Sequence, residues 1–298
     1  MIGDSVLDLI GSTPMVRINK LNINKDVKVY AKLEGFNPTG SIKDRVALKM
    51  IEEAEKNGEL KPGKIILEAT SGNTGIGLAM VGSQKGYKVV VVMSSAVSVE
   101  RRKMMKAFGA DVILTSPDLG TDGAIMKVRE LMSEHPDKYY NPNQFSNENN
   151  KLAHKLTAEE IWKQTDGKIT HFVASLGTSG TLMGVGKALK KFNSKIKIIE
   201  AHPEEGHKIQ GLKNMKEAIV PKIYDPSMVD QHITINTEDA YSVARRIVRE
   251  ESLFVGMSSG AAMQAVLDIL PKLPKDSVVV VIFPDRGEKY LSTKLFEI

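Results

Sequence analysis

The 298-residue sequence contains no cysteine. Disulfide bonds and thiolate metal sites are therefore excluded. Long hydrophobic runs are also missing, because no apolar stretch approaches the ~20 residues that a membrane-spanning helix needs. Residues 1–14 lack the basic segment and the long apolar segment of a secretory signal. We therefore expect a cytoplasmic chain without a membrane anchor.

Aromatic residues make up only 5% of the chain, and the formal net charge is +5. Lys and Arg are spread along the sequence without a dense block, and few aromatic side chains are present to stack on bases. This pattern favours a small anionic ligand over nucleic acid. The nearest approach to a metal set is His202 with His207, which lie in a Pro/Gly-containing segment without the helical spacing of a zinc motif. We expect no metal site.

Short β-rich segments alternate with amphipathic segments of helical length. The β-rich segments are residues 28–34, 64–69, 87–93, 111–115, 170–176, 195–201 and 277–283. Nearly continuous apolar strands that alternate with helices predict largely parallel sheets covered on both faces. A polar, proline-containing stretch at residues 135–150 separates two sets of such elements and is the predicted domain junction. We therefore expect an α/β protein with two domains and a ligand in the crevice between them.

A helix is predicted to begin at Ser41. Its apolar face is formed by Val46, Met50, Ile51 and Ala54. Ser41 with Asp44 three residues later matches a capping box, and Asn57-Gly58 supplies the stop. Lys43 then lies in the first turn, where the helix dipole and burial would both lower its pKa. Such a lysine is a candidate Schiff-base nucleophile, although position alone favours a solvated surface lysine.

Two loops share one arrangement of strand, Gly/Ser/Thr-rich turn and helix. The first contains Thr70-Ser71-Gly72-Asn73-Thr74-Gly75, and the second contains Gly177-Thr178-Ser179-Gly180-Thr181. In both, glycine permits a tight turn, and N–H groups and hydroxyls meet at a helix N-terminus, where an anion is favoured. Each loop is a candidate site for a phosphate or a carboxylate, with a plain strand-to-helix turn as the alternative. Neither matches the Walker pattern or the dinucleotide fingerprint.

Two later segments carry further candidate residues. The segment "VGMSSGAAM" (255–263) offers Ser258 and Ser259 ahead of a predicted helix, where a simple helix cap is the alternative. The segment "FPDRGEKYLST" (283–293) follows the last predicted strand. Its Asp285 and Arg286 are therefore expected at the carboxyl edge of the sheet, unless they form only a surface ion pair.

Taken in order, these motifs resemble those of the β-family (fold type II) pyridoxal-phosphate enzymes, the cysteine synthase and cystathionine β-synthase group, and most of all its cysteine synthase B branch. The resemblance is carried by "IGSTPMVRI" (10–18), residues 32–63, "EATSGNTGIGLAM" (68–80), residues 100–115, "NQFSN" (143–147), "THFVASLGTSGT" (170–181), "HPEEG" (202–206), "GMSSGAA" (256–262) and "DRGEKYLST" (285–293). It implies a tryptophan synthase β-like fold of two open twisted sheets. A smaller mobile domain would span residues 36–147, and a larger one residues 1–35 plus 148–298.

The resemblance also implies the cofactor, pyridoxal 5′-phosphate (PLP), and the residues that hold it. Lys43 would form the internal aldimine and later move the Cα proton. Asn73 would bind the ring 3′-oxygen, and Ser258 would face the pyridine nitrogen. The cofactor phosphate would lie against Gly177, Thr178, Ser179, Gly180 and Thr181. The substrate carboxylate would be held by Thr70, Ser71, Asn73, Thr74 and Gln144.

The reaction implied by the resemblance is β-replacement through an α-aminoacrylate, which forms L-cysteine from O-acetyl-L-serine and sulfide. Lys213 stands where the cysteine synthase B branch has arginines, and as a substrate-binding cation it suggests O-phosphoserine as an alternative donor. Serine with homocysteine giving cystathionine, or cysteine releasing hydrogen sulfide to leave serine or lanthionine, are further alternatives. Outside this chemistry stands a catalytically silent PLP-binding partner protein. The resemblance implies a homodimer and suggests serine acetyltransferase as a partner.

Overall fold

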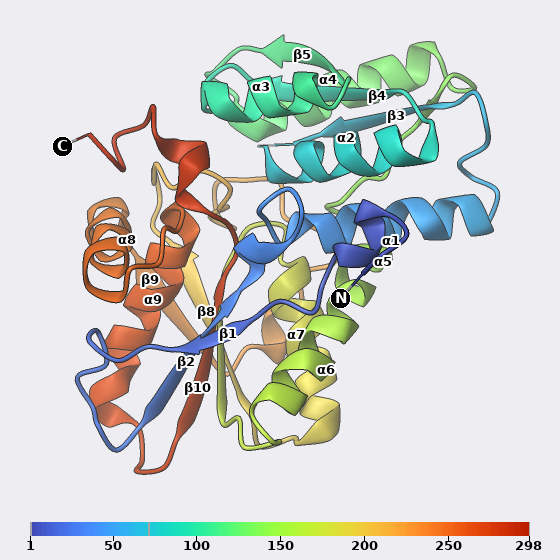
Figure 1. The fold of residues 1–298 in the computed structure, drawn as a ribbon. Helices are drawn as coiled ribbons and strands as arrows, with labels where there is room; N and C mark the ends of the chain where they lie inside the picture. The colour runs from blue at the N-terminus through green and yellow to red at the C-terminus, as the bar shows by residue number, and fades with distance from the viewer. Residues whose placement is uncertain (1, 71, 298) are drawn as a thin grey trace.

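The computed structural model describes residues 2–70 and 72–297. The described strands form two separate sheets (Figure 1). In spatial order, the six-stranded sheet consists of β1 (Met15–Arg17), β2 (Lys28–Leu33), β10 (Val278–Phe283), β7 (His171–Ser175), β8 (Lys197–Pro203) and β9 (Gln231–Ile235). All neighbours in this sheet are parallel except β1 and β2.

The four-stranded sheet is parallel throughout. In spatial order it consists of β5 (Asp111–Thr115), β4 (Val89–Ser94), β3 (Ile65–Ala69) and β6 (Tyr139–Tyr140). The expected α/β class with largely parallel sheets is thereby confirmed. All seven predicted β-rich segments contain a strand, whereas β1, β6 and β9 were not predicted. These three strands lie at sheet edges, where the apolar signal of a strand buried on both faces is absent.

Helices cover both faces of each sheet (Figure 1). Around the four-stranded sheet lie α1 (Lys43–Lys56), α2 (Asn73–Lys85), α3 (Val99–Ala107) and α4 (Gly120–Glu134). Around the six-stranded sheet lie α5 (Glu148–Leu152), α6 (His154–Gln164), α7 (Gly180–Phe192), α8 (Thr237–Glu251) and α9 (Met257–Ile269). Within the described residues, no helix is long and apolar enough to cross a membrane.

The apolar runs of the central strands exist because each sheet has a core on both faces. On β10, Val279, Val281 and Phe283 pack under α8 and α9, whereas Val280 and Ile282 pack under α6 and α7. The same alternation divides β4 between a core shared with α1 to α3 and a core under α4. A strand buried on both faces reads as a continuous apolar segment, and this made the central strands recognisable in the sequence.

Two local expectations need adjustment. The capping box at Ser41 is wrong: α1 begins at Lys43, and the carboxylate of Asp44 accepts the N–H of Thr39 (2.7 Å) instead of the N–H of Ser41. Ser41 Oγ does accept the N–H of Lys43 (3.3 Å), so the serine still supports the first turn. The stretch at residues 135–150 contains β6, which pairs with β3, so its first part belongs to the four-stranded sheet.

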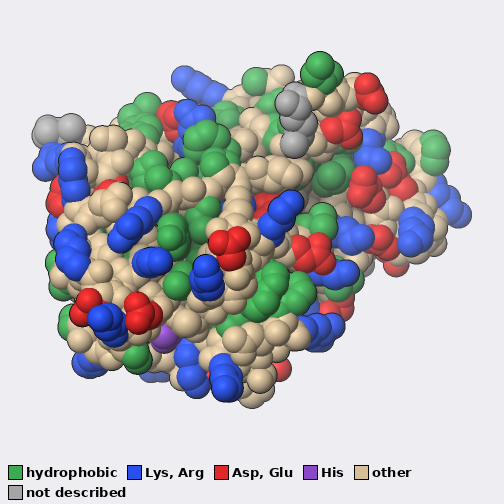
Figure 2. Space-filling model, turned by 60° about the horizontal axis from the view of Figure 1, so that its bottom comes forward, with side chains coloured by type: hydrophobic (Ala, Val, Ile, Leu, Met, Phe, Trp, Pro, Cys, Tyr) green, Lys and Arg blue, Asp and Glu red, His purple; other side chains and the backbone are tan. Residues whose placement is uncertain are grey.

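Basic and acidic side chains are interspersed on the face shown in Figure 2. Among the described residues, partly exposed side chains of opposite charge also form ion pairs, for example Lys190 with Asp230 at 2.7 Å. The face does not resemble the stripe of like charge that tracks a nucleic-acid backbone.

Candidate functional site

A cleft with about 880 Å³ of space, part of it open to solvent, forms a cavity at the carboxyl ends of the strands, where parallel sheets usually place ligands. Its wall combines residues of the six-stranded sheet with residues of the helices and loops around both sheets. From the predicted site it contains Lys43, Asn73, Thr74, Gln144, Gly177, Thr178, Ser179, Gly180, Thr181, Lys213 and Ser258. The loops that looked interchangeable in the sequence therefore face one common space.

Lys43 is the first residue of α1. The backbone just before it is tied to the end of β10, because Ile42 donates its N–H to Pro284 (2.8 Å) and Ser41 forms a bridge with Asp285. Burial lowers the pKa of Lys43 to about 8, and the Asp285 carboxylate opposes this effect. A large fraction of the amine is therefore unprotonated at mildly alkaline pH, as a nucleophilic lysine requires.

The turn before α7 has the features of an anion site. Ser179 occupies the N-cap position with a left-handed φ of 66°, and its Oγ is buried without a hydrogen-bond partner among the described residues. The neighbouring Thr178 Oγ1 accepts from the side chain of Asn150 (3.1 Å). A Cβ on Gly177 would lie 2.5 Å from the carbonyl oxygen of Gly211, so only glycine fits there. An anion at this N-terminus would interact favourably with the helix dipole and satisfy the Ser179 hydroxyl.

The turn before α2 contributes Asn73 and Thr74. Asn73 donates Nδ2–H to Asp285 Oδ2 (2.7 Å), while its buried Oδ1 has no hydrogen-bond partner within residues 2–70 and 72–297. Thr74 donates its hydroxyl to Gln144 Oε1 (2.7 Å). Thr70 is not part of the described cavity wall; its side chain is buried and accepts the N–H of Gly72 (3.1 Å). Ser71 lies outside the described residues.

Glu68, at the end of β3, positions the segment that carries Gln144. Its carboxylate accepts the N–H groups of Asn143 (2.8 Å) and Gln144 (3.3 Å) and the side-chain amide of Asn141 (3.2 Å). Burial raises the pKa of Glu68 to about 8, although these hydrogen bonds oppose the shift. Glu68, the acidic residue that opens the motif "EATSGNTG", therefore holds the segment that carries Gln144 in place and does not itself line the described cavity.

Sequence reasoning assigned no role to Arg101 and Tyr290, which also line the cavity. The guanidinium of Arg101 lies 4.5 Å from the centre of the Tyr290 ring, donates to Gln210 Oε1 (3.0 Å) and is 4.0 Å from Asp285. Tyr290 donates its hydroxyl to Asp285 Oδ2 (2.6 Å). Both residues belong to motifs that carried the family resemblance, "ERRK" and "DRGEKYLST", but the motifs alone give no indication that they meet.

Asp122 was also missed in the sequence. It lies in the first turn of α4, and its Oδ1 accepts a hydrogen bond from Lys213 Nζ (2.9 Å). The same ammonium is 5.0 Å from the centre of the Phe145 ring. The structure thus brings the predicted Lys213 to the cavity but pairs it with a carboxylate.

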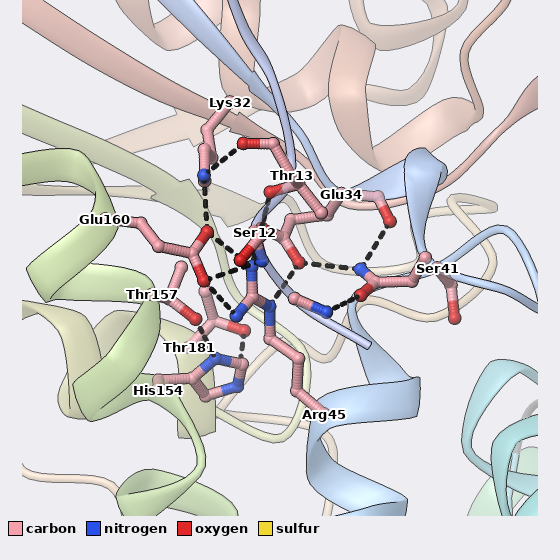
Figure 3. Close-up of polar contacts among 12 residues, drawn as sticks. Ser12, Thr13, Lys32, Glu34, Ser41, Arg45, His154, Thr157, Glu160 and Thr181 are labelled. Atoms are coloured by element: carbon pink, nitrogen blue, oxygen red, sulfur yellow. Dashed lines mark hydrogen bonds and ion pairs between the residues drawn. The ribbon is translucent and has the colours of Figure 1, made fainter. Parts of the chain in front are cut away.

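A largely buried polar network lies next to the residues of the cavity wall (Figure 3). Arg45, two residues after Lys43, donates to Glu34 (2.8 Å), which directly follows β2, and to Glu160 from α6 (2.7 Å). His154, at the start of α6, connects to the first turn of α7 through a 3.2 Å hydrogen bond between its Nε2 and Thr181 Oγ1. Burial, followed by the charges of Lys43 and Arg45, lowers the pKa of His154 well below its usual value, so the ring is neutral. Because Glu160 and His154 both belong to α6, this helix connects α1 to the first turn of α7.

Comparison with known proteins agrees with this geometry. A family model described as "Pyridoxal-phosphate dependent enzyme" matches residues 6–285. A cysteine synthase of Aquifex aeolicus is 49% identical over 98% of this chain and 92% of its own length. Cysteine synthase B of Pseudomonas aeruginosa is 43% identical over 98% and 97% of the two chains.

A solved structure of a cysteine-forming relative is also similar to this chain. The crystal structure of O-acetyl serine sulfhydrylase isoform 3 from Entamoeba histolytica superposes with a TM-score of 0.92 and 43% identity, covering 100% of this chain and 92% of that one. The resemblance inferred from the motifs is confirmed: the chain belongs to the pyridoxal-phosphate-dependent enzymes and, among them, to the cysteine synthases.

Proposed function

We propose that this protein is a PLP-dependent cysteine synthase that forms L-cysteine from O-acetyl-L-serine and sulfide by β-replacement. The observation that carries the proposal is that a lysine with a lowered pKa, Lys43, shares one cavity with an anion-binding turn at Gly177–Thr181 and with Asn73. The names of its relatives, cysteine synthase and O-acetyl serine sulfhydrylase, support the choice of donor and product.

The residues present fit PLP. The unpartnered Ser179 hydroxyl at the N-terminus of α7 suits a phosphate, which we assign to Gly177, Thr178, Ser179, Gly180 and Thr181. Lys43 Nζ would hold the cofactor covalently, and Ser258, in the first turn of α9, would face the ring nitrogen. Asn73 has a second Nδ2 hydrogen to offer the ring 3′-oxygen. When bound, PLP supplies an electron sink for the carbanion at Cα of the amino acid.

Lys43 also moves the proton in this proposal. With a pKa of about 8, its amine accepts a proton from Cα of the donor and returns it after the nucleophile has added. The Asp285 carboxylate stabilises the protonated amine in the interval, because opposite charges favour the ionised form. Neither step needs a metal ion.

We assign the donor carboxylate to Thr70, Ser71, Asn73, Thr74 and Gln144. Thr74 and Gln144 are hydrogen-bonded to each other on the cavity wall, and Gln144 Nε2 donates to Ala69 O (3.0 Å) with one hydrogen left for a ligand. Thr70 would need to release the N–H of Gly72 to take part. We propose that residues 36–147 form a smaller domain that closes on residues 1–35 plus 148–298 and excludes water from the reaction.

A panel of donors and nucleophiles tests the function. Purified PLP-loaded protein is expected to convert O-acetylserine and sulfide to cysteine faster than it converts O-phosphoserine and sulfide to cysteine, serine and homocysteine to cystathionine, or cysteine to hydrogen sulfide. Lys43→Ala should abolish turnover, whereas Lys49→Ala, a lysine on the same helix that pairs with Glu53, should keep it. No sulfide-dependent cysteine from O-acetylserine would refute the proposed activity, and turnover by the Lys43→Ala protein would refute the role of the lysine.

We further propose a cytoplasmic homodimer, as the family resemblance implies, with serine acetyltransferase as a partner that inserts a carboxyl-terminal peptide into the cavity. Sedimentation of the PLP-loaded protein should give twice the 32.7 kDa chain mass. A monomer at micromolar concentration would refute the dimer. A peptide partner should compete with O-acetylserine, and non-competitive behaviour would contradict binding in the cavity.

A further inference from the structure

The ion pair between Asp122 and Lys213 lies beside the cavity and joins elements that belong to the two sheets. Asp122 comes from α4, which covers the four-stranded sheet, and Lys213 from the segment that follows β8 of the six-stranded sheet. Asp122 is fixed at two points, because its Oδ1 accepts from Lys213 Nζ (2.9 Å) and its Oδ2 accepts the N–H of Ile219 (3.1 Å). Lys213 is fixed as well, with its ammonium over the Phe145 ring and its side chain only 9% exposed.

The pairing determines the charge that a ligand meets at this part of the cavity wall. The described cavity wall contains three cationic side chains, those of Lys43, Arg101 and Lys213. Lys43 is committed to the cofactor in the proposed function, and Arg101 faces Asp285 at 4.0 Å. Because Asp122 already neutralises Lys213, an anionic group that arrives there meets a carboxylate as well as an ammonium.

We propose that Asp122 is a specificity-determining residue that keeps Lys213 paired, so that the cavity accepts an amino-acid donor with an uncharged ester on Cβ and disfavours one with a phosphate ester. This inference rests on the proposed function and names the substrate class of that same site. A phosphate monoester carries about −1.5 to −2 charges near pH 7, and Asp122 would repel it. A carboxylic ester carries no charge before the Cβ–O bond breaks, so the ion pair remains in place when it binds.

The structure also indicates why Asp122 does not simply move aside. Turning its carboxylate away from a phosphate would break the hydrogen bond to Ile219 as well as the one to Lys213. The buried position of Lys213 then matters, because an ammonium that loses its partner in such a place needs another anion. Removing the charge of Asp122 while keeping its shape should therefore convert Lys213 into a site for phosphate.

The test compares Asp122→Asn with Asp118→Asn. Asp118 precedes α4, is exposed and contacts Ser116, so its replacement makes the same change in net charge away from the cavity. For the PLP-loaded proteins, kcat/KM is measured with O-acetylserine and with O-phosphoserine at fixed ionic strength. Asp122→Asn should raise the ratio of phosphoserine to acetylserine use by about tenfold or more, mainly through KM, as expected for one charge-assisted hydrogen bond. Asp118→Asn should leave the ratio unchanged.

Two further measurements separate specificity from a structural role. The double variant Asp122→Asn/Lys213→Gln should lose the gain, and inorganic phosphate should inhibit Asp122→Asn more strongly than the wild-type holoenzyme. Asp122→Ala serves in the same assays if Asp122→Asn does not fold. An equal change with both donors, or a wild-type protein that uses both equally well, would overturn the role of Asp122. A wild-type protein that makes no cysteine from O-acetylserine contradicts the proposed function instead, while the phosphate inhibition still decides the role of Asp122.

Discussion

Replacement of Glu160 by Gln tests the buried network of Figure 3. The Glu160 carboxylate accepts hydrogen bonds from Arg45 Nη1 (2.7 Å), Arg45 Nη2 (2.8 Å), Lys32 Nζ (2.6 Å) and Ser12 N (3.0 Å). The side chain of Lys32 is 0% exposed and that of Arg45 is 4% exposed. Glutamine removes the negative charge and turns one acceptor into a donor that faces these cations.

The loss of stability expected for Glu160→Gln can be worked out in two ways. Breaking a buried ion pair by removing one partner typically costs about 3–5 kcal/mol. Independently, the hydrogen bonds and charges of Arg45 and Lys32 outweigh burial and lower the pKa of Glu160 from 4.5 to about 2. This lowering corresponds to roughly 3 kcal/mol of stability. Burial also lowers the pKa of Lys32, which offsets part of the gain, so we expect a loss near 3 kcal/mol.

Urea unfolding of the PLP-loaded protein measures this loss. Glu159→Gln is the matched control, because the side chain of Glu159 is 41% exposed and lies 3.7 Å from that of Lys155, a surface pair that contributes only about 0–1 kcal/mol. The pH dependence gives a second readout. A depressed carboxylate stabilises the fold above its unfolded pKa, so the wild-type protein should lose this contribution between pH 4.5 and about 2, and Glu160→Gln should not. If both variants lie within about 0.5 kcal/mol of each other, the network argument is wrong.

Three further predictions concern the cavity. Because the pKa of Lys43 is lowered to about 8, the rate of PLP binding to the apo-protein should rise with pH up to about 8 and then level off; a rise that continues to pH 10 would contradict this value. Gly180→Ala would place a Cβ 1.9 Å from Asn150 Oδ1, so PLP affinity in a titration should fall by at least tenfold; unchanged affinity would show that Asn150 moves freely. Tyr290→Phe removes a 2.6 Å hydrogen bond to buried Asp285 and should lower the free energy of unfolding, measured by thermal unfolding, by about 1.5–3 kcal/mol. An unchanged free energy of unfolding would show that this hydrogen bond does not stabilise the site.

Most of the architecture was predictable because it depends on short-range patterns. Strands such as β10 and β4 can be predicted from their apolar runs, since both of their faces are buried. Helix α1 shows its buried face through residues three and four apart. The edge strands β1, β6 and β9 escaped notice because they are short or partly exposed, so their composition resembles that of loops.

The capping box predicted at Ser41 does not form, although the sequence motif for it is present. Serine and a carboxylate three residues apart satisfy the pattern, and the helix begins within two residues of the predicted position. The carboxylate of Asp44 nevertheless turns to Thr39, because the chain bends back at residues 39–41 and offers a nearer N–H group. Local spacing defines which contacts are permitted, and the path of the preceding chain selects among them.

The sequence by itself determined the α/β class, the family and the set of loops that face the cavity, because these depend on residue types at fixed spacing along one element. Only the tertiary structure decided how those loops are paired across the fold. Asn73 meets Asp285 from 212 residues away, and Lys213 meets Asp122 from 91 residues away. Such contacts depend on how two sheets pack and where their connecting loops run. For this reason the sequence identified Lys213 as a cation of the substrate site, and only the fold revealed that the carboxylate of Asp122 neutralises it.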